Sequence, residues 1–428
     1  MTLRDASLFG LVGLLIVLTG VMQSWNLALQ VLNMGLISAI MALGVNLQWG
    51  FAGLFNVGVM GFVALGGLAV ALVAMPPVAE SWRVGGAGIV GSMVVALITI
   101  LAAVWVWKSR RLSRAWRGWL VALILVVGFI IYRTLFDPAR DAVESVNPAL
   151  QGHLGGLGLP ALVAWPIGGV LAAGAAWIIG KTALGLRSDY LAIATLGIAE
   201  IILAVMKNED WLARGVKNVI GVPSPLPTAI ELQERASFAE RFVDPVTAST
   251  LTVKLGYSLL FTVVLVILLV LMQLALRSPW GRMMRAIRDN ETAAAAMGKN
   301  VTRRHLQIFI LGSAICGVAG AMMTTLDGQL VPGTYQPLRF TFLVWVMVIV
   351  GGSGNNYGAV LGGFLIWFLW VQVEPVGQWL IGTATAGLPE GAFKSHLVDS
   401  AAYMRLFTMG VLMLLVLRFS PRGLIPER

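Results

Sequence analysis

The sequence predicts an all-α integral membrane protein, a polytopic helical bundle of about 10–12 transmembrane segments. Of its 428 residues, 58% are apolar and only 12% are charged, whereas a soluble domain carries about a quarter charged residues. Apolar runs close to the roughly 20 residues that cross the hydrocarbon core recur from end to end. No soluble fold covers so much apolar surface with polar groups, so lipid must be the solvent for much of the chain.

Twelve apolar runs are predicted crossings, and several are short enough to be tilted or broken. They lie near residues 8–22, 29–47, 57–75, 86–107, 119–136, 162–179, 188–206, 256–276, 305–326, 336–350, 359–371 and 403–418. The first run follows Arg4 and has the length of a signal-peptide core. Gln23, Ser24 and Trp25 follow it in place of a small-x-small cleavage site, which favours a retained first helix.

The net charge of +10 is concentrated in particular short loops, which is typical of membrane orientation and not of nucleic-acid binding. With the N-terminus in the cytoplasm, alternation places the basic segments 108–117 and 277–304 inside. The tail, with Arg418, Arg422 and Arg428, also falls inside, and the mixed loop around 207–255 falls outside. We therefore predict that both termini are cytoplasmic, that the larger loop is periplasmic, and that nucleic acid is not a partner.

One apolar stretch, 336–371, needs a break for this alternation to hold. Read as a single crossing, it would place the basic tail outside the cell. The run Gly351-Gly352-Ser353-Gly354 is a strong turn signal within it. We therefore predict two helices joined by a tight turn on the cytoplasmic side.

Small residues are patterned in the run 305–326. Gly312, Cys316 and Gly320 fall at i, i+4 and i+8, so they give one helix a face without bulk that allows close helix packing in lipid. A lone cysteine forms no internal disulfide. Three scattered histidines, His153, His305 and His396, do not make a metal-ligand pattern, so no metal site is predicted.

The segment 277–298 carries the most information about function. Ser278-Pro279 is a helix start, arginines recur every three positions from Arg282 to Arg288, and an alanine run led by Glu291 stops at Gly298. We predict a short amphipathic helix on the cytoplasmic membrane surface. Two interpretations remain: a basic loop that only obeys membrane orientation, or a helix that docks into a groove on a cytoplasmic partner.

This segment is similar to the coupling-helix region of bacterial ABC importer permeases, in which an alanine-rich loop ending in glycine docks onto the ATPase. Further stretches extend the likeness, and together they resemble the LivM family of branched-chain amino acid permeases. They are 42–46 with 53–58, 189–200, 350–354 and 418–426. Two features depart from the family: Ser188 replaces a more usual glycine, and the basic loop 108–118 with the run 119–136 resembles an insertion, which affects the span count.

The resemblance implies a single permease domain over 1–428 in the bacterial inner membrane, with a coupling helix around 277–300. It also implies a second homologous permease, two cytoplasmic ATPases that hold ATP and magnesium, and a periplasmic substrate-binding protein. The substrate class would be leucine, isoleucine, valine or related small amino acids, and urea or short-chain amide permeases share the architecture. Because the chain has no Gly-x4-Gly-Lys-Ser/Thr motif, we expect no cofactor and no enzymatic activity in this chain itself.

Candidate site residues follow in two groups. The predicted docking residues on the ATPase are Arg285, Asp289, Glu291, Ala294 and Gly298. Polar groups in apolar surroundings, the candidates for the substrate path or a gate, are Asn46, Asn56 and Glu200. An intramembrane carboxylate is costly, so Glu200 either serves the path or is hydrogen-bonded to a neighbouring helix backbone.

Two other classes are weighed against this interpretation. Gly352-Ser353-Gly354 with His396 superficially resembles an intramembrane serine protease, but the predicted topology places serine and histidine on opposite membrane faces, beyond hydrogen-bond reach. A secondary transporter or channel would work without ATPases. The scarcity of intramembrane charge pairs and the coupling-like helix argue against it.

Overall fold

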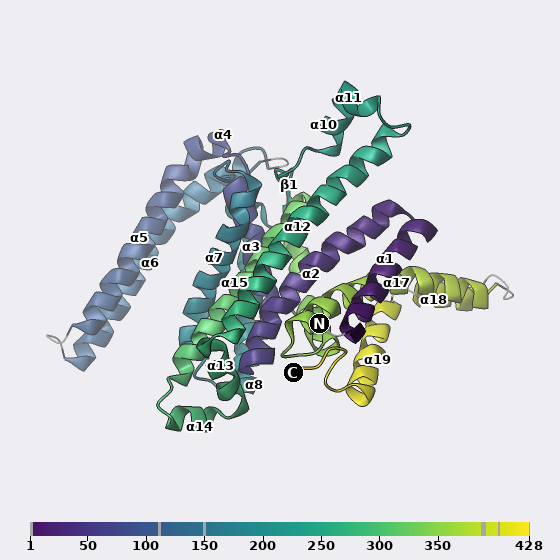
Figure 1. Cartoon of the computed structure of the whole chain (residues 1–428). Coiled ribbons are helices and arrows are strands. Elements are labelled where there is room, and N and C mark those ends of the chain that lie inside the picture. The colour runs from purple at the N-terminus through teal and green to yellow at the C-terminus, as the bar shows by residue number, and fades with distance from the viewer. Residues whose placement is uncertain (1–2, 110–112, 149–150, 387–390, 401–402, 428) are drawn as a thin grey trace.

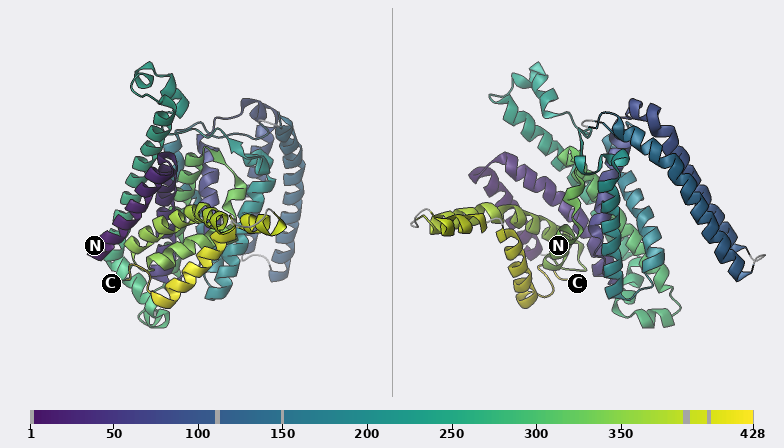
Figure 2. Two further views of the ribbon diagram at one scale, coloured as in Figure 1. Left: turned by 90° about the vertical axis from the view of Figure 1, so that its right-hand side faces the viewer. Right: turned by 180° about the vertical axis from the view of Figure 1, so that it is seen from behind.

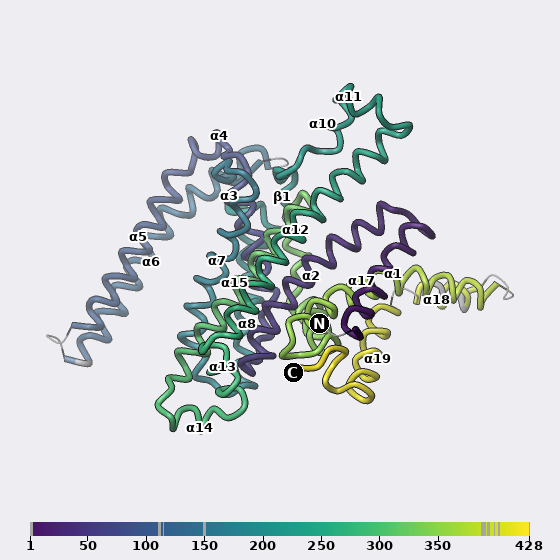
Figure 3. Tube along the Cα trace, viewed as in Figure 1, coloured from purple at the N-terminus to yellow at the C-terminus, as the bar shows by residue number. Residues whose placement is uncertain are grey.

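A computed structural model describes residues 3–109, 113–148, 151–386, 391–400 and 403–427, and most of them are helical. Residues 110–112 of the predicted basic loop and Arg428 of the predicted basic tail lie outside the described residues. Figure 1 shows a bundle of long helices with one helical hairpin standing away from it. The same path is traced without ribbon detail in Figure 3.

Two long helices form the centre of the bundle, α2 (Trp25–Ala52) and α15 (Val301–Asp327). α2 begins where the Ser24 side chain accepts a hydrogen bond from the backbone N–H of Leu27, and it ends at Gly53 in the left-handed conformation. Most of α2 is buried. The helices packed around this pair are α1 (Leu3–Met22), α3 (Val59–Ala74), α7 (Ala161–Ala183), α12 (Pro245–Arg277), α16 (Pro337–Gly351) and α17 (Asn356–Ala384).

The central helices approach closely through small residues. A Cβ atom on Gly320 would lie 1.9 Å from the Val63 carbonyl oxygen of α3, and one on Gly312 would lie 2.6 Å from the Gly44 carbonyl oxygen of α2. Between them, the Cys316 Sγ lies 3.9 Å from the Met41 carbonyl oxygen. The face predicted from Gly312, Cys316 and Gly320 thus contacts both α2 and α3. Van der Waals packing at this spacing is what holds helices together in lipid.

One antiparallel hairpin diverges from the bundle, as the view from behind shows best (Figure 2). It consists of α4 (Ala79–Ser81), the π-helical turn η1 (Trp82–Gly86), α5 (Ala87–Lys108) and α6 (Arg114–Ser145). A small cluster of buried side chains, among them Phe136, Val143 and Trp211, attaches it at one end. The predicted insertion, residues 108–136, falls within this hairpin.

The segment between α8 (Ser188–Asn208) and α12 lies at one end of the bundle (Figure 1). Its elements are α9 (Asp210–Ala213), η2 (Gly215–Lys217), β1 (Val219–Ile220), α10 (Ala229–Glu234) and α11 (Ala236–Ala239). β1 pairs antiparallel with β2 (Gln329–Leu330), which precedes the short helix η3 (Pro332–Tyr335). α12 begins at Pro245, capped by Asp244, and so starts earlier than the predicted run near 256.

The chain breaks between α16 and α17 where the turn signal predicts it. α16 ends at Gly351, and α17 begins at Asn356, where the Asn355 side chain accepts backbone N–H bonds from Tyr357 and Gly358. After α18 (Ala392–Ser400) and α19 (Met404–Phe419) the tail returns to this break. The backbone N–H groups of Leu424 and Ile425 donate to the carbonyl oxygens of Val350 and Gly351, both at 2.9 Å.

The predicted fold class is confirmed. Among the described residues, nine helices are long and apolar enough to cross a membrane. Each of the twelve predicted runs contains a helix. Three of these helices, α3, α16 and α19, have 16, 15 and 16 residues and are shorter than the nine candidate crossings. A helix of 16 residues is about 24 Å long, shorter than the hydrocarbon core of about 30 Å. These short helices need neighbouring buried backbone to complete a crossing.

Candidate coupling site

The segment between α12 and α15 lies at the end of the bundle opposite α10 and α11 (Figure 1). It forms two helices, α13 (Pro279–Asp289) and α14 (Glu291–Ala296), so the predicted single helix is wrong. The break lies at Asn290, whose backbone is extended and whose side-chain oxygen accepts a hydrogen bond from the Ala293 N–H at 2.9 Å. An asparagine at this position caps a new helix instead of continuing the old one.

α13 is fixed to the bundle by one apolar face. Gly281, Met284 and Ile287 are buried, and they recur every three residues along this face. A Cβ on Gly281 would lie 2.2 Å from the Leu276 carbonyl oxygen, so the turn from α12 into α13 is tight. α13 thus packs against the ends of α12 and α2.

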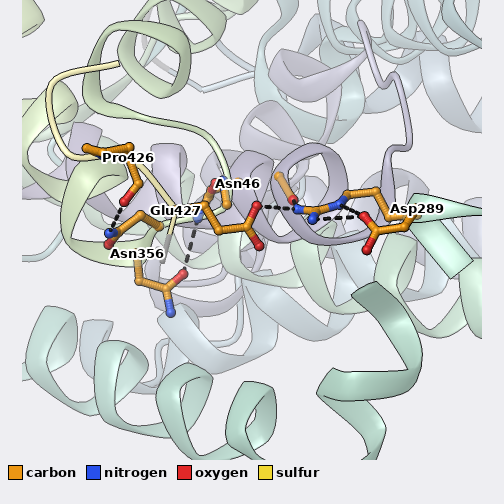
Figure 4. Close-up of polar contacts among 9 residues, drawn as sticks. Asn46, Asp289, Asn356, Pro426 and Glu427 are labelled. Carbon is orange, nitrogen blue, oxygen red and sulfur yellow. Dashed lines mark hydrogen bonds and ion pairs between the residues drawn. The ribbon is translucent and has the colours of Figure 1, made fainter. Parts of the chain in front are cut away.

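Arg288 joins α13 to two other parts of the chain (Figure 4). Its Nη1 donates to the Gly50 carbonyl oxygen at 2.5 Å and to Glu427 Oε2 at 2.8 Å. Its Nε and Nη2 donate to Asp289 Oδ1. Burial acts to lower the pKa of Arg288, but the bonds to Glu427 and Asp289 outweigh it and raise that pKa above its ordinary value. The guanidinium therefore stays charged, and it holds the C-terminal tail to α2.

A second layer of amide bonds continues from this point (Figure 4). Asn46 Oδ1 accepts from the Gly354 N–H at 2.8 Å, and Asn46 Nδ2 donates to Asn356 Oδ1 at 3.2 Å. Asn355 Nδ2 donates to the Pro426 carbonyl oxygen at 3.0 Å. The turn between α16 and α17 is thus tied to α2 on one side and to the tail on the other. We call these residues, with Arg288, Asp289, Gly50 and Glu427, the Arg288 network.

Asn56 belongs to a neighbouring buried cluster. Its Nδ2 donates to Gln48 Oε1 at 2.9 Å, and Gln48 Nε2 donates to the Phe309 carbonyl oxygen and to Ser313 Oγ. The Trp345 indole N–H donates to the Asn56 carbonyl oxygen at 3.0 Å. Asn46 and Asn56 are fully buried, and both tie α2 to other helices. Buried amides satisfied in this way fix one arrangement of the helices they join.

Glu200 lies apart from these clusters, on the exposed face of α8. Ile193 and Gly197 share this face, and a Cβ on Gly197 would meet no atom within 4 Å. No hydrogen bond or ion pair to the Glu200 side chain is present among the described residues. The carboxylate therefore points away from the rest of this chain.

The predicted docking residues lie in two settings. Glu291 and Gly298 are exposed and Ala294 is partly exposed, all on or just after α14, which projects beyond the bundle. Gly298 has a φ of +77°, a conformation that glycine adopts at little cost. Asp289 is exposed and paired with Arg288. Arg285 is partly buried and lines a polar recess with Asn355 and Tyr357.

Sequence reasoning missed the most connected residue of this site. Arg288 was visible as one of three regularly spaced arginines, but no pattern distinguished it from Arg282 and Arg285. Its partner Glu427 lies 139 positions away. The one available signal was an acid within an otherwise basic tail.

The protease alternative finds no support in the geometry. Ser353 lies in the turn between α16 and α17, and His396 lies on α18. Both residues are described, and their side chains make no hydrogen bond to each other.

Fold and site together define a polytopic membrane protein with a helical element exposed at one end. A model of the family described as branched-chain amino acid transport system / permease component matches residues 27–149 and 118–417. Since these matches cover well over half of the sequence, the chain belongs to this family. The resemblance predicted from the motifs is confirmed at the level of the family.

Individual relatives agree. The chain is 29% identical over 252 residues to the high-affinity branched-chain amino acid transport system permease protein LivM of Escherichia coli K12, with 58% of each chain covered. It is 28% identical over 301 residues to the probable LivM of Methanocaldococcus jannaschii, covering 70% of this chain and 76% of that one. The xylose transport system permease protein XylH of Escherichia coli K12 is 24% identical over 277 residues. The chain thus spans 58% of the length of the Escherichia coli LivM. No solved structure matches it.

Proposed function

We propose that the chain is the membrane-spanning permease subunit of an ABC importer that moves branched-chain amino acids into the cytoplasm. The observation that carries the proposal is α14, a short exposed helix joined through α13 and Arg288 to the helical bundle. Family membership and the printed names of the LivM relatives support the substrate class. ATP and magnesium would be held by two separate ATPases, each serving one permease of a pair.

The proposed orientation puts α13, α14 and both chain ends in the cytoplasm. Arg4 donates to the Leu424 carbonyl oxygen and Glu427 pairs with Arg288, so the two ends lie beside α13. Basic residues concentrate in this region of the sequence, which favours the cytoplasmic side. α10 and α11, at the other end, would then face the periplasm and a substrate-binding protein.

Coupling would run from α14 to the Arg288 network. ATP binding would draw the two ATPases together and shift α14, for which Arg285, Asp289, Glu291, Ala294 and Gly298 are the proposed docking residues. α13 would transmit the shift because its apolar face and Arg288 attach it to α2 and to the tail. Asn46 and Asn56 would act as gate residues, since their bonds hold α2, α15 and α17 in one arrangement.

Glu200 remains a proposed path residue. A carboxylate within a crossing is costly in lipid, so its exposed face must meet water or protein. A second homologous permease packed across α8 would provide either environment.

The test is uptake by proteoliposomes that contain this chain, its second permease and the two ATPases. Binding protein and radiolabelled substrate are added outside, and ATP is enclosed. We expect leucine uptake that requires ATP, and no comparable uptake of xylose, urea or acetamide. Leucine uptake without ATP, or uptake of urea or xylose in its place, would contradict the proposal.

A further inference from the structure

A cavity of about 290 Å³ lies among α2, α3, α15, η3, α16 and α17. It extends from the end of the bundle opposite α13, where Leu27 and Thr334 lie, to Met41 and Met60. Beyond these methionines, Trp345 packs edge to face against Trp49 and Phe55, whose own rings are tilted against each other.

The wall of the cavity is mostly apolar and adaptable. Methionines are prominent in it, including Met34, Met323 and Met347, and Trp367 and Trp370 come from α17. Methionine is unbranched and polarizable, so it fits aliphatic groups of different shape. The volume is near the lower end for small-molecule sites. A wall of this kind suits a single aliphatic side chain better than a sugar, which needs many hydrogen-bonding groups.

Four polar side chains in the wall have no hydrogen-bond partner among the described residues: Gln30, Ser38, Asp327 and Thr334. Asp327 is the one carboxylate among the lining residues, and it forms no ion pair within the described chain. It is the last residue of α15, where the partial negative charge of the helix end disfavours a carboxylate. Asp327 is exposed, so solvent hydrates its carboxylate in the free protein, and an incoming cation would supply the counter-charge that it lacks among the described residues.

We infer that this cavity receives the amino acid on its way through the permease, with Asp327 as the acceptor for its α-ammonium group. The aliphatic side chain lies among the methionines, and Gln30 and Thr334 offer donors to the α-carboxylate. This inference rests on the proposed function and names the recognition site within it. It predicts selectivity against urea and sugars, because they carry no ammonium group for Asp327 and no aliphatic chain for the apolar wall.

The experiment compares uptake by the complete reconstituted complex at saturating leucine-loaded binding protein, which removes the affinity of the binding protein from the result. Asp327→Asn removes the charge and keeps the size, and Asp327→Glu restores the charge. Glu80→Gln is the matched control, an exposed acid toward the same end of the bundle without an ion pair among the described residues. We expect Asp327→Asn to lower the leucine uptake rate roughly tenfold or more, as losing a bond between charged groups does.

Asp327→Glu and Glu80→Gln should import leucine within about twofold of the unaltered complex, and Glu80→Gln should also keep its basal ATP hydrolysis. Unchanged leucine uptake by Asp327→Asn would overturn the inference and leave the proposed function intact. Loss of basal hydrolysis or of subunits in that variant would show a structural role and would also overturn it. If the unaltered complex imports no leucine, the proposed function itself fails, and the inference fails with it.

Discussion

The bond between Arg288 and Glu427 is the contact through which the tail is held to α13, and its removal makes a sharp prediction. The two side chains are 24% and 31% exposed, and their charged atoms lie 2.8 Å apart. Arg288 also donates to Gly50 and Asp289, whereas the tail carboxylate makes no other ion pair among the described residues. The two substitutions Arg288→Met and Glu427→Gln therefore differ in what they leave behind.

The expected magnitudes follow from this partial burial. An exposed ion pair contributes about 0–1 kcal/mol, and removal of one member of a buried pair costs about 3–5 kcal/mol. Glu427→Gln keeps a neutral acceptor and should cost about 1 kcal/mol. Arg288→Met loses three acceptors and should cost about 2–3 kcal/mol. With Arg288 absent, the tail carboxylate is partly buried without a counter-charge, so Glu427→Gln should become neutral or stabilising in that background.

The assay is a double-mutant cycle on the free energy of unfolding, measured by SDS titration of the purified chain in mixed micelles. We expect a coupling energy of about 1 kcal/mol or more between the two positions. Arg282→Met is the matched control, since Arg282 on the same helix is exposed and, among the described residues, bonds only to the Arg277 carbonyl oxygen. It should change stability by less than about 0.5 kcal/mol. Additive effects of Arg288→Met and Glu427→Gln would refute the reasoning.

Three further predictions concern single positions. Gly298→Ala places an L-residue at a φ of +77°, which costs about 1–2 kcal/mol. ATP-driven uptake should therefore fall several-fold while membrane insertion is unchanged. The control Gly333→Ala, at an equally open site, should leave uptake unchanged. Gly320→Ala places a Cβ 1.9 Å from the Val63 carbonyl oxygen and should lower the free energy of unfolding by about 1–3 kcal/mol in the same SDS titration. The control Gly174→Ala, whose Cβ meets open space, should be neutral or stabilising. Equal changes in unfolding free energy for the two variants would show that close packing at Gly320 is unimportant. Burial lowers the pKa of His153, which lies outside the crossings, so the unfolded chain binds the proton more readily and stability should fall as pH drops below about 6.5. His153→Phe should reduce this acid sensitivity in melting curves recorded between pH 5 and 8. A variant whose stability depends on pH as the unaltered chain's does would contradict this prediction.

The general fold could be predicted because apolar length and loop charge are local properties of the sequence. The break at Gly351 to Asn356 was predictable for the same reason, since a glycine-rich turn and the charge alternation agree. Boundaries were less accurate: α12 and α17 extend beyond their predicted runs because capping residues such as Asp244, and not hydrophobicity, determine where helices end.

The site was only partly predictable because its contacts join distant segments. The predicted single coupling helix failed at Asn290, where a capping side chain outweighs the helical spacing of the arginines. Asn46 and Asn56 stood out as polar residues in apolar surroundings, but their partners Asn356 and Gln48 depend on how α2 packs. Asp327 gave no sequence signal at all, because its proposed role depends on the cavity that α2, α3, η3, α16 and α17 complete.

The most direct test of the account is whether ATPase subunits bind through α14. The chain is purified in detergent after expression with its proposed partners, unaltered and as Ala294→Arg, which places a large cation at the one partly buried position of the otherwise exposed α14. We predict that the unaltered chain retains two ATP-binding subunits and the second permease, and that Ala294→Arg loses the ATP-binding subunits while it keeps the permease. An Ala294→Arg chain that retains both ATP-binding subunits with normal ATP hydrolysis, or an unaltered chain that purifies alone, would contradict the account.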